Sequence, residues 1–244
     1  MEQTLQIISL QSLAYSFIPV AVVFVILAKW SLSTQRAMTA ISRMLVQLLL
    51  IGYFLVYIFE SDNAWFVGFI LLLMVFFSSW IALSNLPIRK AKVVKSALIS
   101  IFLSAAFTII IITQGVLALS PWYYPQTLLP IAGMIFASCM NAVSLSGERF
   151  YAELSKRVSY QQARNIAFQT SMIPNINALV AVGIVSLPGM MTGQILSGVS
   201  PFVAARYQIM VMCMVFASAG IASAIFLILV KDKPFQLKNK SNGS

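Results

Sequence analysis

Residues 64–83 read AWFVGFILLLMVFFSSWIAL, an apolar stretch without a single charged side chain. An α-helix rises about 1.5 Å per residue, so roughly 20 helical residues cross the ~30 Å hydrocarbon core of a bilayer. This stretch has that length, and a helix satisfies its backbone hydrogen bonds within the segment, as lipid requires. Residues 64–83 therefore predict a transmembrane helix.

Six other stretches have the length and composition for the same interpretation, although Pro188-Gly189 interrupts one of them. We therefore expect an all-α integral membrane protein with about seven transmembrane helices. The predicted spans are Ile7–Ala28, Ser42–Phe59, Ala64–Leu83, Ala97–Leu117, Leu128–Ser146, Ile176–Val199 and Arg206–Val230.

The composition of the whole chain agrees with these spans. Of 244 residues, 60% are apolar and 9% are charged, and the mean hydropathy is +0.91. A soluble domain needs about a quarter of its residues charged, so this chain is expected to be a multi-pass protein of the cell membrane, with the lipid bilayer as its solvent. The net charge of +10 lies in short clusters between the spans, which argues against nucleic-acid binding.

Basic residues gather in alternate loops. The segments after the first, third, fifth and seventh predicted spans hold fifteen of the sixteen lysines and arginines. The opposite side carries Glu2, Glu60 and Asp62, with Arg206 as its one basic residue. Because cytoplasmic loops are enriched in Lys and Arg, the N-terminus is predicted outside and the C-terminus in the cytoplasm.

The residues that most catalytic and metal centres require are missing from the sequence. It contains no histidine, no P-loop motif and no central carboxylate in any predicted span. We expect no enzymatic activity, no cofactor and no dedicated metal site in this chain, and ion-coupled carriers usually keep an intramembrane carboxylate. Cys139 and Cys213 both lie in apolar stretches, so each is interpreted as a small buried hydrophobe.

The interrupted sixth span is the first candidate for function. Proline removes a helical hydrogen bond, and a broken helix at membrane depth is tolerated only against protein or a water-filled cavity. The break is either a structural kink or a place where freed carbonyls face a substrate. Methionine thioethers suit soft metals such as Cu(I), although methionine is also ordinary core filler. The predicted translocation path comprises Asn141, Ser186, Pro188, Gly189, Met190, Met191 and Thr192.

Residues 147–173 form the largest predicted cytoplasmic segment, inside a single transmembrane domain that comprises residues 1–244. Its apolar residues recur at helical spacing, and Ser159-Tyr160 is a plausible turn, so we expect two short helices at the membrane face. The segment is either a solvated loop or the docking element for a cytoplasmic partner. The docking candidates are Glu148, Arg149, Glu153, Tyr160 and Arg164.

Several motifs together resemble the FetB (YbbM) family. They are residues 130–135 (PIAGMI), Asn141, residues 183–198 (GIVSLPGMMTGQILSG) and residues 206–211 (RYQIMV). Members of that family are membrane subunits of an ABC transporter linked to iron export, and a plant relative paired with a separate ATPase is tied to aluminium tolerance. The cytoplasmic stretch before the sixth span is shorter here than in the family, with no glycine between Gly147 and Gly183.

The resemblance implies an ABC permease subunit that exports iron or another metal. It implies a homodimer, because ABC transporters need two membrane halves, and a separate FetA-like cytoplasmic ATPase that holds ATP and Mg²⁺. Two alternatives stay open at this point. One is an ABC permease for an organic or sugar-nucleotide solute, and the other is a self-contained channel or secondary carrier.

Overall fold

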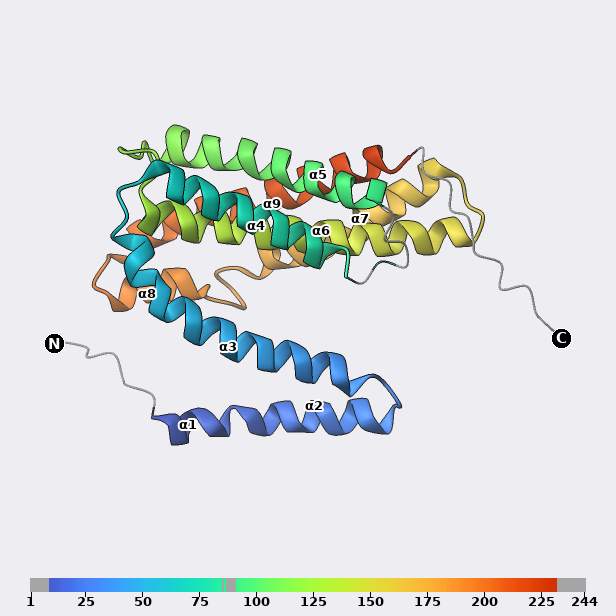
Figure 1. Ribbon diagram of the computed structural model, residues 1–244, viewed down its shortest axis with the longest axis horizontal. Coiled ribbons are helices and arrows are strands. Elements are labelled where there is room, and N and C mark those ends of the chain that lie inside the picture. The colour runs from blue at the N-terminus through green and yellow to red at the C-terminus, as the bar shows by residue number, and fades with distance from the viewer. Residues whose placement is uncertain (1–8, 85, 87–90, 232–244) are drawn as a thin grey trace. The chain divides into compact units, whose positions relative to one another are not determined.

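The computed structural model describes residues 9–84, 86 and 91–231, and in this part of the chain it contains helices and no strand (Figure 1). The chain divides into two units, Met1–Glu60 and Ser61–Ser244. The prediction that residues 1–244 form one membrane domain stays a prediction. Six residues used for the predicted orientation lie outside the described residues: Glu2, Arg89, Lys90, Lys233, Lys238 and Lys240.

The first unit consists of α1 (Leu10–Tyr15), α2 (Phe17–Lys29) and α3 (Thr34–Phe59). Ser9 caps α1, since its hydroxyl oxygen accepts a hydrogen bond from the backbone N–H of Ser12 at 3.1 Å. At the junction with α2, the Ser16 hydroxyl donates to the Leu13 carbonyl at 2.7 Å. The turn into α3 includes Ser31 with φ of 55°, and α3 begins eight residues before the predicted span.

The second unit contains the remaining helices. They are α4 (Ala64–Ala82), α5 (Ala91–Ile110) with its π-helical continuation η1 (Ile111–Val116), α6 (Pro125–Ser155), α7 (Tyr160–Ala181), α8 (Gly189–Leu196) and α9 (Pro201–Leu229). The long helix α6 packs against four of the others, α4, α5, α7 and α9. Its buried side chains, such as Ile135 and Phe150, form one apolar core with Phe226 of α9.

Serine side chains hold the helices of this unit together. Ser104 of α5 donates to the Ser218 carbonyl of α9 at 2.8 Å, and Ser138 of α6 donates to the Val215 carbonyl at 2.9 Å. The hydroxyls of Ser171 on α7 and Ser223 on α9 lie 2.9 Å apart. Small residues allow close helix approach in lipid, and such interhelical hydrogen bonds contribute about 0.6 to 2 kcal/mol each.

Six helices in the described residues are long and apolar enough to cross a membrane. They are Gln11–Lys29, Thr34–Phe59, Ala64–Ala82, Ala91–Val116, Pro125–Ser155 and Pro201–Leu229. Helix α7 has sufficient length, but it is not among them because it carries several amide side chains and Arg164. The chain is therefore an all-α, multi-pass membrane protein, whereas seven crossings and the direction of its termini stay predictions.

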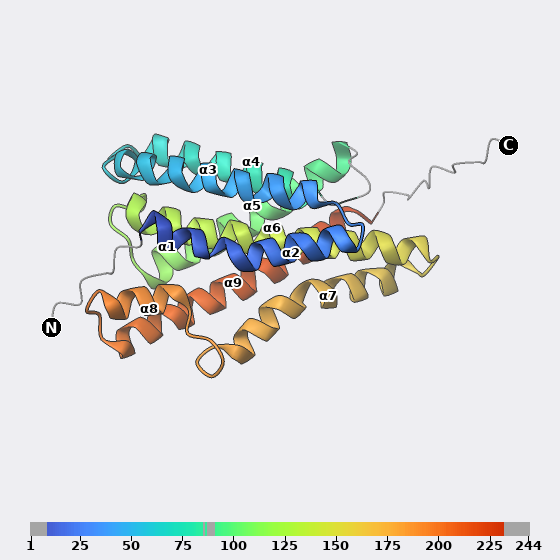
Figure 2. The ribbon, with the colours of Figure 1, turned by 90° about the horizontal axis from the view of Figure 1, so that it is seen from below.

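The predicted interruption of the sixth span, Ile176–Val199, is present, but the alternative of a kink in one continuous helix is wrong. Helix α7 ends at Ala181, and residues 182–188 form a loop before α8 begins (Figure 2). Gly183 has φ of +81°, a left-handed conformation that glycine adopts without the strain of a side chain. Its N–H donates to the Ser186 carbonyl at 2.9 Å, and Pro188 then serves as the N-cap of α8. The chain therefore turns here rather than kinking.

The two short helices predicted within residues 147–173 are also wrong. These residues belong to the end of α6 and the beginning of α7, two long helices that meet at a corner of residues 156–159. The predicted turn lies in the right place. The Ser159 hydroxyl accepts from the Gln162 N–H at 3.3 Å, and the Gln162 side chain accepts from the Ser159 N–H at 3.4 Å, which is a capping box.

Candidate functional site

Helices α7 and α9 run side by side in opposite directions, and three hollows follow one another along α7. At one end, the Tyr160 hydroxyl donates to the Leu227 carbonyl at 3.1 Å, and at the other, Leu179 and Gln208 line the same hollow. The first hollow has a volume of about 370 Å³, the middle one about 320 Å³ and the third about 330 Å³. The arrangement provides a series of cavities along the most polar of the long helices.

The middle hollow lies between α6, α7 and α9. Asn141 of α6 and Asn175 of α7 line it, together with Ser138 and Ser171. Pro174 lies beside Asn175 within α7 and lacks an N–H, so the Thr170 carbonyl has no helical partner there. This hollow therefore collects amides, hydroxyls and a weakened stretch of helix backbone, groups that can replace part of the hydration shell of a polar solute.

The third hollow lies between the end of α7, α8 and the first half of α9. Its wall is mostly aliphatic, and it also contains Met191, Met212, Cys213 and Gln208. The Gln208 side chain is buried, with the residue 6% exposed, and its Oε1 has no hydrogen-bond partner. The prediction that Cys213 is buried is wrong, because its place on α9 leaves the side chain exposed, whereas Cys139 is buried as expected.

The structure does not bring the predicted path residues into one cavity. Asn141 lines the middle hollow and Met191 the third, while Met190 packs against the apolar core. Thr192 donates its hydroxyl to the Pro188 carbonyl at 3.2 Å. The side chain of Ser186 and the backbone of Gly189 are exposed outside the three hollows, at the α7–α8 loop and the first residue of α8. That Asn141 and these loop residues form a path stays a prediction.

Sequence reasoning missed the residues that complete the two hollows. Met212 and Cys213 follow Gln208 by four and five residues along α9, so the three side chains share one face of the helix with Ala205 and Ile209. This periodicity was readable in the sequence. The position of Asn175 opposite Asn141 was not, because it depends on how α7 packs against α6.

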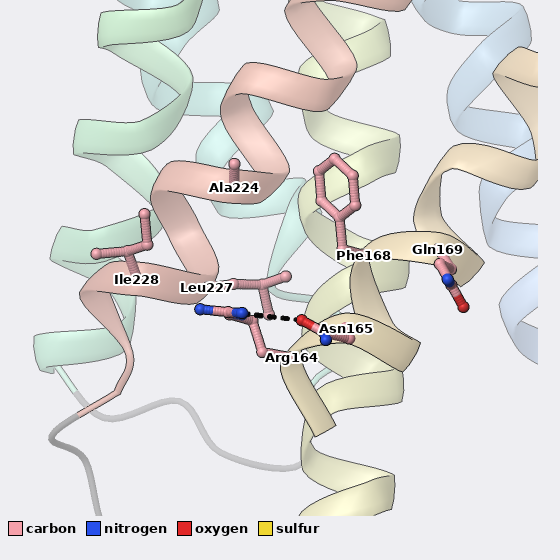
Figure 3. A pocket seen from close by; sticks show the side chains of 7 residues that line it. All are labelled: Arg164, Asn165, Phe168, Gln169, Ala224, Leu227 and Ile228. Carbon is pink, nitrogen blue, oxygen red and sulfur yellow. Dashed lines mark hydrogen bonds between the residues drawn. The ribbon is translucent and has the colours of Figure 1, made fainter. Parts of the chain in front are cut away.

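The first hollow lies near the α6–α7 corner. Arg164 donates from Nε and Nη2 to Asn165 Oδ1 at 3.1 and 3.0 Å, and Figure 3 shows its guanidinium extending toward the α9 side chains. The ring centroid of Tyr160 lies 5.9 Å from Arg164 Cζ and 5.8 Å from Lys231 Nζ, within the range of cation–π attraction. Tyr160 thus ties the beginning of α7 to the end of α9.

The docking residues predicted from the sequence divide into two groups at this corner. Glu153 is 4% exposed and pairs with Arg149 Nη2 at 2.9 Å and Lys156 Nζ at 3.0 Å, while Glu148 is exposed. Tyr160 and Arg164 belong to the α7–α9 contact described above. The ion pairs brace the last turn of α6 and leave the cationic side chains on the outside of the corner. Docking of a partner here stays a prediction.

We expect Glu153→Gln to lower the free energy of unfolding by about 1 kcal/mol. The substitution removes a nearly buried carboxylate from two charged hydrogen bonds, but the exposed cations weaken that loss through solvent screening. Thermal unfolding of the purified chain would measure the difference. The control is Glu148→Gln, at an exposed side chain five residues earlier on α6, which should stay within about 0.5 kcal/mol of the unsubstituted chain. Equal effects of the two substitutions would contradict a bracing role for Glu153.

Among the described residues, no three His, Cys, Asp or Glu side chains come together in a group that could hold a metal ion. A metal that passes along α7 would therefore meet amide and carbonyl oxygens and the sulfur atoms of the third hollow. Amide and carbonyl oxygens suit hard cations, whereas thioethers and thiolates suit soft ones.

Comparison with known proteins places these features in a wider group. Residues 10–235 match the model of a family described as an uncharacterised protein family, UPF0014. The chain is 31% identical to the probable iron export permease protein FetB of Escherichia coli, over 94% of this chain and 93% of the relative. It is 33% identical to the UPF0014 membrane protein YjkA of Bacillus subtilis, over 91% of this chain and 95% of the relative.

A plant protein is related at a greater distance. The protein ALUMINUM SENSITIVE 3 of Arabidopsis thaliana is 27% identical, over 75% of this chain and 71% of the relative. No solved structure matches the chain.

Proposed function

The chain belongs to the UPF0014 family of membrane proteins, and from this premise we propose that it is the permease subunit of an ABC transporter that exports a metal. A separate cytoplasmic ATPase supplies the energy and holds the ATP and Mg²⁺. The permease works as a homodimer and has no catalytic activity of its own. The name of the Escherichia coli relative, a probable iron export permease, supports iron, or a metal related to it, as the cargo.

The observation that carries this proposal is the polar helix α7. Gln162, Asn165 and Gln169 follow one another at spacings of three and four residues and are exposed, so they form an amide stripe on one face. Amides facing hydrocarbon are costly, so such a stripe favours contact with water or with another chain. We infer that α7 lines the path, with a second copy of the chain covering its exposed face.

Coupling to the ATPase follows from the α6–α7 corner. The corner connects the contacts of Tyr160 with the end of α9 to the ion pairs of Glu153. A displacement of the corner would therefore move α7 and α9 together. Both helices line all three hollows. ATP-driven closure of the ATPase would therefore change the width of the hollows and alternate access to them.

Copurification tests this proposal directly. We expect the tagged full chain, extracted gently from host membranes, to retain a soluble ATPase with Walker motifs in about equal amount. Reversing charge at the corner with Arg149→Glu and Arg164→Glu should reduce the recovered ATPase, whereas Arg206→Glu, on α9 and remote from the corner, should not. If no ATPase is recovered even after crosslinking, a self-contained channel or carrier replaces the proposal.

An organic solute is the second candidate cargo. The aliphatic wall of the third hollow, with Leu179, Val182 and Leu187, favours an apolar or amphipathic molecule over a hydrated ion. Stimulation of ATP hydrolysis in the purified complex separates the two. A metal cargo predicts stimulation by metal salts, and an organic cargo predicts stimulation only by amphipathic solutes.

A further inference from the structure

Three sulfur-containing residues from two helices line the third hollow. Met191 comes from α8, and Met212 and Cys213 are neighbours on α9. The Cys213 thiol is free and exposed. The three side chains line one cavity of about 330 Å³, which is large enough for a metal ion with its ligands. Thioether and thiolate groups are the donors that soft cations such as Cu(I) prefer.

The local fold explains why these side chains meet. The positive φ of Gly183 turns the chain at the end of α7, and the loop returns it so that α8 packs beside α9. Ser200 then caps α9, since its hydroxyl accepts from the Val203 N–H at 3.4 Å. Along α9, residues 205, 208, 209, 212 and 213 share the face directed at α8 and the loop. Met191 of α8 thereby lines the same hollow as Met212 and Cys213 of α9.

A second observation points to a ligand in the same cavity. Gln208 lies one helical turn from Met212, and the residue is 6% exposed. The residue is one of those that line the hollow, and its Oε1 is buried without a hydrogen-bond partner. Buried amide oxygens in proteins nearly always have a partner, so an unpartnered one on a residue of this wall points to a ligand in the hollow.

We propose that the third hollow binds a soft monovalent cation, Cu(I) or Ag(I), through the thioethers of Met191 and Met212 and the thiolate of Cys213. The Gln208 amide oxygen completes the polar side of the cavity. As a step in transport this site rests on the permease function proposed above, whereas the binding itself does not.

Charge decides between monovalent and divalent cargo. One thiolate neutralises one monovalent cation, so the complex carries no net charge in the low dielectric of the membrane. A divalent ion would keep one uncompensated positive charge, since the hollow contains no carboxylate. On binding, the Cys213 S–H bond breaks, a metal–sulfur bond forms and the proton passes to solvent. The metal keeps its oxidation state, so no electron donor or acceptor is needed.

Titration of the purified full chain with Cu(I) tests the site. The chain would be held in lipid nanodiscs, and a Cu(I) chelator of known affinity would compete for the metal under reducing conditions. We expect Cys213→Ser and the double substitution Met191→Leu with Met212→Leu each to weaken Cu(I) binding by more than about 10- to 100-fold, the usual loss for an outer-shell partner. X-ray absorption should report sulfur neighbours around the bound metal.

Matched controls use the same residue types elsewhere. Met140 packs against the apolar core, and Cys139 is buried in that core; neither residue lines the third hollow. Met140→Leu and Cys139→Ser should therefore leave the Cu(I) affinity unchanged. Unchanged Cu(I) affinity in the cavity variants would overturn the site. An equal loss of affinity in the control variants would also overturn it, because Cu(I) would then bind to sulfur-containing side chains in general. If Fe(II) competed with Cu(I) as strongly as Ag(I) does, the proposed preference of the site for soft cations would be wrong.

The same preparation separates this site from the permease function. If the chain recovers its ATPase and metals stimulate hydrolysis, but the cavity variants bind Cu(I) as the unsubstituted chain does, the site is wrong and the permease stands. If the cavity variants lose Cu(I) but no ATPase is recovered, the site is supported and the permease function fails.

Discussion

Replacing Phe226 with alanine is expected to destabilise the second unit by about 3 kcal/mol. Phe226 is fully buried near the end of α9 and packs in the core that α6 and α9 share. Gly147 of α6 lies so close that a Cβ built there would be 3.2 Å from Phe226 Cε1. Removing the ring from such a contact leaves a cavity, because the surrounding helices relax only partly.

The expected destabilisation by Phe226→Ala lies at the low end of the range measured for soluble proteins, and the reason is physical. Lipid tails are as apolar as a protein core, so a transmembrane helix gains little from the hydrophobic effect when it packs against another. The cost of Phe226→Ala is therefore mainly the cavity and the lost dispersion contacts. Reversible unfolding in detergent mixtures would measure it.

The matched control for Phe226 lies on the same helix. Phe202, in the first turn of α9, is 85% exposed, so Phe202→Ala should change the free energy of unfolding by no more than about 0.5 kcal/mol. If the two alanine substitutions cost the same, the packing of α9 against α6 described here is wrong.

The helices were predictable from the sequence to the extent that their ends carry local signals. Helix α4 ends one residue before its predicted end, and Asn63 marks its beginning, since Asn63 Oδ1 accepts from the Trp65 N–H at 2.9 Å. The beginning of α9 was missed although Ser200-Pro201 is a cap followed by proline at the first helical position. An apolar window begins later than the helix itself.

Charged residues explain why the C-terminal end of α6 was predicted too early. The predicted span stopped at Ser146, where Gly147, Glu148 and Arg149 end the apolar stretch, but the helix continues to Ser155. Hydropathy reports which part of a helix lies in lipid, and a helix can extend beyond it into water. The paired Glu153 then stabilises the extension, which a search for apolar segments cannot detect.

The candidate sites were less predictable because they depend on contacts between distant segments. Met191 was identified from its position after Pro188-Gly189, yet its partners Met212 and Cys213 belong to another helix. The tie between Tyr160 and the Leu227 carbonyl joins residues 67 apart in the chain. Single-sequence patterns describe individual helices, and which faces of α7 and α9 meet depends on their packing.

The largest functional effect is expected in the middle hollow, where Asn141→Leu combined with Asn175→Leu should reduce transport about 100-fold. The two amides line the hollow between α6 and α7, and leucine fills a similar space without a polar group. A hydrogen bond to a charged group contributes roughly 1.5 to 3 kcal/mol, so losing two would add about 3 kcal/mol to the barrier for a cation. That increase corresponds to about a 100-fold lower rate.

Metal efflux from vesicles that contain the permease and its ATPase would measure this loss, and survival of cells at high metal concentrations would report it in the host. Asn177→Leu is the matched control, because Asn177 is exposed on α7 and lies outside the three hollows. The double variant should still recover the ATPase, since neither asparagine lies at the α6–α7 corner. Full efflux in the double variant would place the path elsewhere, and the loss of efflux in the Asn177 variant would mean that the exposed face of α7, rather than the middle hollow, conducts the cargo.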